Sequence, residues 1–246
     1  MQAWYYIFLG IVQGIAEWLP ISSDGHLFIA GELLGLKLDL ALVVLLHGAS
    51  LLALIVYFWR DLITLAKGFF KVEPQSVKYV GLLAITTIIT IPVALLLDPY
   101  IGQFEQMKWV AIFLLITSVF VGASFWSKER GSIGWKSAIL LGLVQGTAVM
   151  PGLSRSGPMI ALALLLGASS KEAFKFTFLA GIPVILGAFI WEFTDMTWNY
   201  YYLLGFIVTF FVGLITLKLL NLIVRKNKFY LFAIYTALLA LVILFI

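Results

Sequence analysis

The first residues that could do chemistry are a carboxylate and an amide inside an apolar segment. Gln13 and Glu17 are four residues apart, so a helix places their side chains on one face. Because a carboxylate in so apolar a segment is costly and rare, its presence indicates a function. The structural alternative is that Glu17 lies at a hydrated helix end and caps a neighbouring group. We expect Glu17 to hold a hard cation or activate a nucleophile, with Gln13 as a further cation ligand.

A second polar group follows directly, in the run Ser22-Ser23-Asp24-Gly25-His26. Ser23 and His26 are three residues apart and would meet on one helix face, which places a candidate nucleophile beside a candidate base. Each residue also has a structural alternative, since a lone Ser or Asp here is most often a helix N-cap and His26 could be a satisfied interior histidine. We take Ser23 and His26 as candidate catalytic residues, Ser22 as a substrate ligand and Asp24 as a second candidate cation ligand.

The third polar group is the run Gly152-Leu153-Ser154-Arg155-Ser156-Gly157, which precedes another apolar helix. The backbone N–H groups at the start of that helix, with the helix dipole behind them, favour an anion. Arg155 adds a planar guanidinium suited to phosphate, while Ser154 and Ser156 add hydroxyl donors. The alternative is that Arg155 only neutralises a buried carboxylate or extends to the membrane surface. We expect Arg155 to be catalytic and Gly152, Ser154, Ser156 and Gly157 to bind substrate.

These three groups together favour phosphoryl transfer. One half of the chain supplies carboxylate, hydroxyl and imidazole, and the other supplies a guanidinium at a helix N-terminus. Magnesium or calcium fits such an oxygen-rich site, whereas zinc fits poorly, and the absence of cysteine excludes thiolate ligands and nucleophiles. His47 begins an apolar segment and is equally consistent with a histidine at the membrane surface, so it stays outside the candidate set.

The composition is that of an integral membrane protein, and its elements must position these residues. Of its 246 residues, 63% are hydrophobic and only 11% are charged, against about half and about a quarter in a soluble domain. The net charge of +4 comes from basic residues spread among apolar runs. This distribution orients a membrane protein, and we exclude nucleic-acid binding. The N-terminal residues lack the features of a removable signal and are expected to belong to the fold.

Six segments are apolar over roughly the 20 residues that a spanning helix needs. Two further apolar regions, 2–36 and 134–168, are each broken in the middle by Pro, Gly and polar residues. Irregular backbone at membrane depth survives only where protein or water satisfies it, so we interpret both regions as re-entrant helix pairs. The alternative is two full spans in each region. The six predicted spans are 40–59, 77–97, 108–126, 173–191, 199–219 and 229–246.

The two broken regions are copies of an internal repeat. A shift of 132 positions aligns Gly10, Gln13 and Gly14 with Gly142, Gln145 and Gly146, and it aligns Ser22 and Gly25 with Ser154 and Gly157. Three predicted spans follow each pair, so the second copy has the opposite orientation, as in proteins whose binding site lies near the membrane midplane. The sequence therefore predicts an all-α polytopic membrane protein, a single domain (1–246) with inverted halves of about 1–130 and 131–246.

The basic residues predict the orientation in the membrane. Thirteen of the 16 Lys and Arg residues fall on one side of the predicted topology, Lys37 and Lys108 fall on the other, and Arg155 lies in its motif. Because cytoplasmic loops are enriched in Lys and Arg, both termini and the mouth of the first pair are expected outside the cytoplasm of a plasma-membrane protein. Charge does not separate re-entrant pairs from double crossings. Segment 60–76 is predicted to be a short cytoplasmic loop with amphipathic character, and Trp59 belongs to the aromatic residues expected at the membrane interface.

The sequence closely resembles the undecaprenyl-pyrophosphate phosphatase family of bacitracin-resistance membrane enzymes over nearly its whole length. The similar segments are Gln13-Gly14-Ile15-Ala16-Glu17-Trp18-Leu19-Pro20, the serine-histidine run from Ser22 to His26, and Pro151-Gly152-Leu153-Ser154-Arg155-Ser156-Gly157. The sequence departs from the family pattern at Gln13, often Glu, at Asp24, usually Thr, and at Pro158-Met159, usually Ala-Thr. These departures bear on metal dependence and activity more than on the fold.

The resemblance implies an enzyme that removes the terminal phosphate from a C55 polyprenyl pyrophosphate at the outer face and recycles the lipid carrier for cell-wall polymers. It implies a divalent cation, Mg²⁺ or Ca²⁺. It assigns Glu17 and Gln13 to cation or water, Ser23 and His26 to nucleophilic or proton-transfer roles, and Arg155 with Ser154 to the pyrophosphate. Which of Ser23 and His26 attacks phosphorus stays open.

Two other functions remain as alternatives from the residues alone. An inverted repeat with a midplane site also suits a lipid-phosphate flippase or an anion transporter, and the departures at Gln13 and Asp24 suit an inactive lipid-phosphate-binding relative. Besides membrane lipids and the lipid substrate, a second copy of the chain is a candidate partner. Small residues that would allow a homodimer, or equally serve internal packing, are Gly205, Gly213 and Ala188.

Overall fold

The computed structural model describes residues 3–35, 38–192 and 199–245 and is helical throughout these ranges apart from its connections. Five of the described helices are long and apolar enough to cross a membrane. Many large apolar side chains on these helices are exposed, as lipid-facing residues are, including Val119, Ile215 and Leu95. The prediction of an all-α polytopic membrane protein is therefore confirmed.

The long helices agree with five of the six predicted spans, and the predicted breaks lie between shorter helices. The bounds are α1 (Ala3–Ala16), α2 (Ser23–Leu34), α3 (Leu40–Phe70), α4 (Pro74–Leu97), α5 (Ile101–Phe104), α6 (Met107–Ala123), α7 (Trp135–Thr147), α8 (Ser156–Leu165), α9 (Ser170–Glu192), α10 (Tyr202–Arg225) and α11 (Phe232–Leu244). Short 3-10 turns are η1 (Asp98–Tyr100), η2 (Ser124–Trp126) and η4 (Phe229–Leu231).

The sixth predicted span, 229–246, is shorter than expected. Its α-helix, α11, has 13 residues, which is about 20 Å at 1.5 Å per residue and less than the roughly 30 Å hydrocarbon thickness. The preceding residues form the 3-10 turn η4, and residue 246 lies outside the described part. Residues 229–246 are apolar over a length that could cross the membrane, but residues 229–231 form the 3-10 turn η4 after α10 and do not belong to α11.

The prediction of a loop over 60–76 is also wrong, because most of this segment is helical. Helix α3 continues without interruption to Phe70, for 31 residues in all, and α4 begins at Pro74. Charged residues such as Arg60 and Lys67 suggested an end to the helix at Trp59. Both residues are exposed on a helix that is longer than the membrane requires. The amphipathic segment is therefore mostly part of α3 and not a loop.

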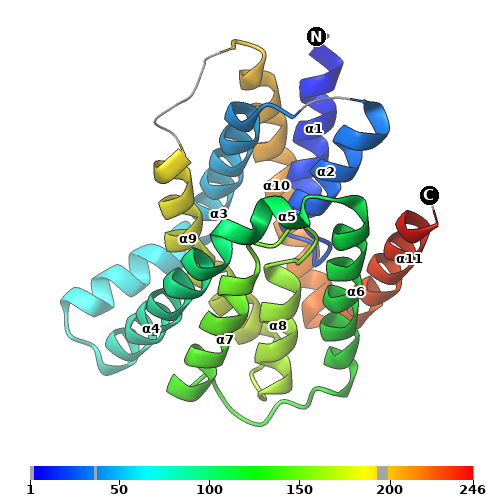
Figure 1. The fold of residues 1–246 in the computed structure, drawn as a ribbon. Helices are drawn as coiled ribbons and strands as arrows, with labels where there is room; N and C mark the ends of the chain where they lie inside the picture. Colours follow the sequence, from blue (N-terminus) through cyan, green and yellow to red (C-terminus); the bar gives the residue numbers. More distant parts are fainter. Residues whose placement is uncertain (1–2, 36–37, 193–198, 246) are drawn as a thin grey trace.

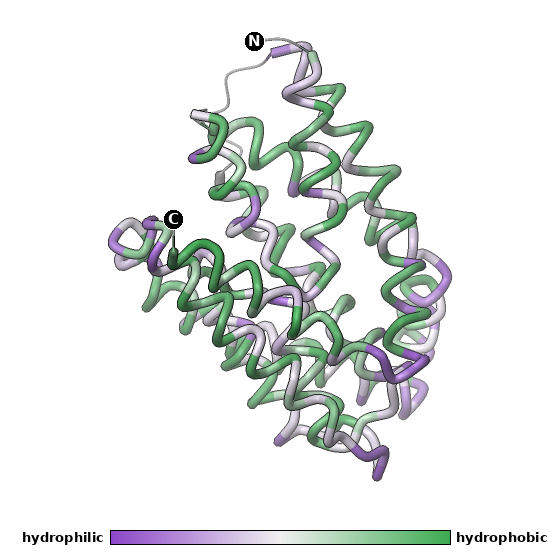
Figure 2. Tube along the Cα trace, turned by 90° about the vertical axis from the view of Figure 1, so that its right-hand side faces the viewer, coloured by the Kyte–Doolittle hydropathy of each residue, from purple (hydrophilic) through white to green (hydrophobic). Residues whose placement is uncertain are grey.

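The two broken regions fold as helix pairs that enter the molecule from opposite ends (Figure 1). Helices α1 and α2 run down and back from the end that holds the N-terminus, and α7 and α8 run up and back from the other end. The turns of the two pairs meet in the interior. Figure 2 shows hydrophobic residues along most of the helices and hydrophilic ones gathered mainly at helix ends and turns.

The first helix of each pair packs tightly on a long helix of the other half. A Cβ atom added at Gly10 would lie 2.7 Å from the carbonyl oxygen of Gly205 on α10, and one added at Gly142 would lie 2.7 Å from that of Thr86 on α4. Thr209 Oγ1 donates to Gly10 O at 3.1 Å. These repeat-related glycines therefore allow the matching helix crossings α1–α10 and α7–α4 to be close.

Two of the small residues considered for a homodimer are used inside the chain. A Cβ atom at Gly205 would lie 3.1 Å from Leu46 Cδ2, and one at Gly213 would lie 2.8 Å from Trp18 Nε1. Both glycines thus accommodate neighbouring helices of the same chain. They give no support to the dimer expectation, which stays a prediction.

We expect Gly10→Ala to destabilise the protein by about 1–3 kcal/mol, because the new methyl group meets backbone that can yield only by separating α1 from α10. Gly81→Ala is the matched control, since a Cβ atom there meets nothing within 4 Å. Thermal unfolding of both purified variants in one detergent measures the difference. A Gly10→Ala protein as stable as the control would show that this crossing is not tight.

Candidate active site

The two helix breaks end with the same side-chain cap. Ser22 Oγ accepts a hydrogen bond from the Gly25 backbone N–H at 3.3 Å, and Ser154 Oγ accepts one from the Gly157 N–H at 3.2 Å. Ser22 holds φ at 69°, a left-handed value that turns the chain sharply into α2. Ser22 thus has the N-cap role that was its structural alternative to substrate binding, and Ser154 makes the equivalent hydrogen bond in the second break.

The caps bring the two breaks into direct contact. A Cβ atom at Gly25 would lie 3.1 Å from the Cα of Gly152, and one at Gly157 would lie 3.0 Å from Pro20 Cβ. Gly152 itself has φ of 95°. With no side chains at these positions, the polar runs from the two halves of the chain lie against each other.

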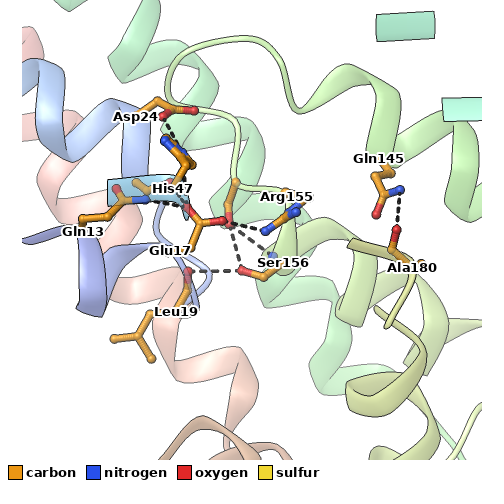
Figure 3. A network of polar contacts seen from close by, with 12 residues as sticks. Gln13, Glu17, Leu19, Asp24, His47, Gln145, Arg155, Ser156 and Ala180 are labelled. Atoms are coloured by element: carbon orange, nitrogen blue, oxygen red, sulfur yellow. Dashed lines mark hydrogen bonds and ion pairs between the residues drawn. The ribbon is translucent and has the colours of Figure 1, made fainter. Parts of the chain in front are cut away.

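Glu17 is the centre of the polar contacts that result (Figure 3). Its Oε1 lies 2.6 Å from the Arg155 guanidinium, while its Oε2 accepts hydrogen bonds from Ser23 Oγ at 2.7 Å and Gln13 Nε2 at 3.1 Å. The Glu17 side chain is only 6% exposed and that of Arg155 is 17% exposed. The structure therefore joins Gln13, Glu17, Ser23 and Arg155, as the sequence predicted, through a nearly buried ion pair.

His47 also reaches this centre, although sequence reasoning left it out. Its Nε2 lies 3.6 Å from Glu17 Oε2 and 3.5 Å from Asp24 Oδ1. Its Nδ1 contacts the Val43 carbonyl oxygen at 3.0 Å, and because a carbonyl only accepts, Nδ1 carries the hydrogen. We call Gln13, Glu17, Ser23, Asp24, His47 and Arg155 the Glu17 cluster. The available signal was that His47 is one of only two histidines in the chain.

The cluster opens on the side of Asp24. The Asp24 side chain is 49% exposed and that of His47 is 25% exposed, compared with 6% for Glu17. The exposure thus decreases from Asp24 through His47 to the ion pair, so a ligand reaching Glu17 would pass Asp24 first.

His26 is not part of the cluster. Its Nδ1 contacts the Ser22 carbonyl oxygen at 2.8 Å, and its Nε2 contacts the Tyr235 hydroxyl of α11 at 2.7 Å. The two rings are also stacked. Since the carbonyl takes the Nδ1 hydrogen, Nε2 of the neutral ring accepts from Tyr235. Ser23 was expected to pair with His26, but it pairs with Glu17. Helix α2 directs the His26 side chain toward α11 instead.

The loop that carries Arg155 is held by buried groups of neighbouring helices. Thr117 Oγ1 on α6 accepts from the Ser154 N–H at 3.0 Å and donates to the Gly152 carbonyl at 3.3 Å. Ser156 Oγ donates to the Leu19 carbonyl at 3.2 Å. Of the predicted phosphate ligands, Ser154 and Ser156 are thus engaged within the protein, and Thr117 is a supporting residue that no sequence signal singled out.

The second half of the repeat does not reproduce the cluster. Gln145, at the position related to Gln13, donates to Thr90 Oγ1 at 3.1 Å and to the Ala180 carbonyl at 3.4 Å, apart from Glu17 (Figure 3). The position related to Glu17 is Val149. Only the first half therefore contributes a carboxylate, and the second contributes the guanidinium.

The oxygen atoms of the cluster suit a hard divalent cation in part. Glu17 and Asp24 supply carboxylates, and Gln13 Oε1 is a buried oxygen for which no hydrogen-bond donor is found. Within the described ranges no three acidic or histidine side chains converge as a complete ligand set. A magnesium ion held by one or two carboxylates usually completes its shell with water and substrate phosphate oxygens. The residues thus fit a cation that is shared with a phosphate.

Comparisons with known proteins identify similar sequences over nearly the whole chain. Residues 6–242 match the family described as bacitracin resistance protein BacA. A protein of Thermosipho africanus named undecaprenyl-diphosphatase is 36% identical over 248 residues, which cover 98% of this chain and 99% of that protein. A Korarchaeum cryptofilum protein of the same name is 35% identical and covers 97% of each chain. A Bacillus thuringiensis protein named undecaprenyl-diphosphatase 2 is 36% identical and covers 96% of each.

We expect Thr117→Val to destabilise the protein by about 1–3 kcal/mol, because it removes a buried donor and acceptor and leaves Ser154 N–H and Gly152 C=O unpaired. Thr236→Val is the matched control. Thr236 is equally buried, but its hydroxyl bonds carbonyls in or beside its own helix, such as Phe232 O. Equal unfolding temperatures for the two variants would contradict the supporting role of Thr117.

Proposed function

The chain belongs to the bacitracin resistance protein BacA family, and we propose that it hydrolyses undecaprenyl pyrophosphate to undecaprenyl phosphate and phosphate. This reaction would recycle a lipid carrier for cell-envelope polymers. The names of the relatives support the proposal. The observation that carries it is the hydrogen bond of the Ser23 hydroxyl to a carboxylate, Glu17, that faces the Arg155 guanidinium.

The pyrophosphate would bind between Arg155 and the start of α8. Arg155 uses one nitrogen on Glu17, and a guanidinium has five N–H donors, so others are available for phosphate oxygens. The dipole of α8 favours the same negative charge, although the Gly157 N–H already donates to Ser154 Oγ and Pro158 has no N–H. The prenyl chain is apolar and would extend into the surrounding lipid.

In the first step, Ser23 Oγ would attack the terminal phosphorus. The new Oγ–P bond forms as the bond from phosphorus to the bridging oxygen breaks, and that oxygen leaves with the electron pair as undecaprenyl phosphate. The hydroxyl proton passes to Glu17 Oε2, to which it already points at 2.7 Å, and then to the leaving phosphate. Ser23 is favoured over His26 as nucleophile because both ring nitrogens of His26 contact other groups.

In the second step, water would release the phosphate from Ser23. Glu17, ionised again, takes a proton from the water as its oxygen forms a bond to phosphorus. The Oγ–P bond breaks, and the proton returns from Glu17 to Ser23 Oγ. Arg155 neutralises the negative charge on the phosphoryl oxygens in both steps, which is the main task of the protein in phosphoryl transfer.

A divalent cation, Mg²⁺ or Ca²⁺, would be held by Glu17 and Asp24, with the oxygen of Gln13 as a further ligand. When bound, it would neutralise charge on the phosphate oxygens. The position of Gln13 supports this assignment, since its buried Oε1 has no donor.

The proposed orientation places both termini and the mouth of the α1–α2 pair on the outer side of the plasma membrane. The basic residues support it. Most of those assigned to the cytoplasmic side lie in or near the connections α3–α4, α6–α7, α8–α9 and α10–α11, such as Lys71, Arg130 and Lys226, whereas Lys108 lies at the start of α6. Lys37, assigned to the outer side, lies outside the described residues.

The direct test is phosphate release from undecaprenyl pyrophosphate by the detergent-purified protein. We expect Ser23→Ala and Arg155→Ala each to lower the rate by about 10³-fold or more, because they remove the nucleophile and the main phosphate charge partner. Arg60→Ala is the matched control, since Arg60 is exposed on α3 and should leave the rate unchanged. Release should also need Mg²⁺ or Ca²⁺ and stop when a chelator is added.

Phosphate release by Ser23→Ala at the rate of the unchanged protein would contradict Ser23 as nucleophile. Lipid binding without any phosphate release by the unchanged protein would favour a carrier or an inactive relative. Release that persists in chelator would contradict the cation.

The orientation can be tested with single cysteines, because the chain has none of its own. Gln103→Cys and Gln75→Cys place thiols on two exposed glutamines, one in α5, beyond the C-terminal end of α4, and one in the first turn of α4. A membrane-impermeant maleimide added to intact bacterial cells should label Cys at 103 and leave Cys at 75 unlabelled until the cells are opened. The reverse pattern would overturn the orientation.

A further inference from the structure

Helices α3 and α4 form a hairpin that is longer than a membrane crossing requires. The 31 residues of α3 extend about 46 Å at 1.5 Å per residue, against a hydrocarbon thickness of roughly 30 Å. Trp59 is of the residue type that marks the membrane interface, and it lies 20 residues into the helix. We call residues 60–78, beyond Trp59, the hairpin tip.

The hairpin tip carries large apolar side chains that the rest of the protein leaves largely or partly exposed. Phe70 is 82% exposed, Val72 is 73% exposed and Phe69 is 43% exposed. Lys67 and Lys71, in the same turn of chain, are exposed as well. Neighbouring apolar and basic side chains of this kind are typical of segments that lie in the interface of a membrane.

The backbone at the tip is arranged in a way that exposes Val72. Its φ is 57°, a left-handed value that is a genuine outlier for a β-branched residue and is usually taken by glycine at a helix end. Hydrogen bonds from Val72 N to Phe69 O at 3.0 Å and from Glu73 N to Gly68 O at 2.8 Å hold this turn. A strained apolar residue kept at an exposed turn indicates a function for its side chain.

The hairpin also leaves the bundle sideways. In Figure 1 its tip, drawn in cyan, is the part of the chain farthest to the left, beyond the other helices. In the same view the tip is no lower than the lower ends of α7 and α8.

We propose that the hairpin tip is an anchor in the membrane interface, with Phe69, Phe70 and Val72 inserted among lipid chains and its lysines on anionic headgroups. The net positive charge of the hairpin tip favours anionic lipid over a basic or neutral partner. Asp61 is already paired with Lys175 of α9, so Glu73 is the one remaining acidic residue of the tip against four basic ones. A leaflet rich in anionic lipid attracts such a segment.

Single cysteines test the insertion on the full-length protein. Phe70→Cys and the control Gln75→Cys, an exposed polar position of the same tip, each receive a nitroxide label in vesicles of phosphatidylethanolamine and phosphatidylglycerol. Electron paramagnetic resonance compares collisions of the label with oxygen, which enters lipid, and with a nickel chelate, which stays in water. We expect the oxygen-to-nickel ratio to be several-fold higher at position 70 than at position 75.

Equal ratios at the two positions would overturn the proposal. Strong dipolar broadening at position 70 would also overturn it, because it would show a second copy of the chain covering the tip. Both results are independent of phosphatase activity.

A second set of vesicles tests the role of charge. Replacing phosphatidylglycerol by phosphatidylcholine, or combining Lys67→Gln, Lys71→Gln and Lys78→Gln with Phe70→Cys, should lower the ratio at position 70. An unchanged ratio in both would overturn the assignment of the lysines to anionic headgroups. The Gln75→Cys label is the water-exposed reference, and its ratio should stay low throughout.

Discussion

The arrangement of the rest of the molecule depends on the ion pair between Glu17 and Arg155. Both side chains are largely buried, and removing one partner of a buried pair leaves an uncompensated charge at a cost of about 3–5 kcal/mol. The two residues come from different halves of the chain. The fold therefore has to bring two polar helix breaks together inside an apolar bundle and keep them in contact.

Small residues meet that requirement at two levels. Gly10 and Gly142 let the first helix of each pair approach a long helix of the other half, and Gly25 and Gly157 let the two turns touch. The halves are alike in backbone but different in chemistry. The repeat places Arg155 opposite Ser23 and Val149 opposite Glu17, so a symmetric scaffold holds an asymmetric site.

The sequence was sufficient for features that depend on composition and local pattern. The broken helix pairs, the apolar helices and the meeting of Glu17 with Arg155 follow from where polar residues interrupt apolar runs. Features that depend on the direction of a side chain were not predictable. His26 and His47 have the same chemistry, yet the turn after Ser22 directs His26 to α11, while the packing of α3 brings His47 to Glu17.

The lengths of the helices were likewise not predictable from the sequence pattern. Hydropathy shows which residues can be in lipid, but α3 continues past Trp59 through charged residues because they lie on its exposed side. The short α11 shows the opposite case, in which a fully apolar run loses residues to a turn. Hydropathy describes neither the length of α3 nor that of α11.

The separation of Glu17 from Arg155 along the chain also determines when the site can exist during synthesis. The two residues are 138 positions apart, so at about 5–20 residues per second Arg155 is made roughly 7–28 s after Glu17. During that interval the contacts available to the carboxylate from this cluster are Gln13 and Ser23 of the first helix pair and His47 of α3. The site is therefore completed only after the second half of the protein has been made.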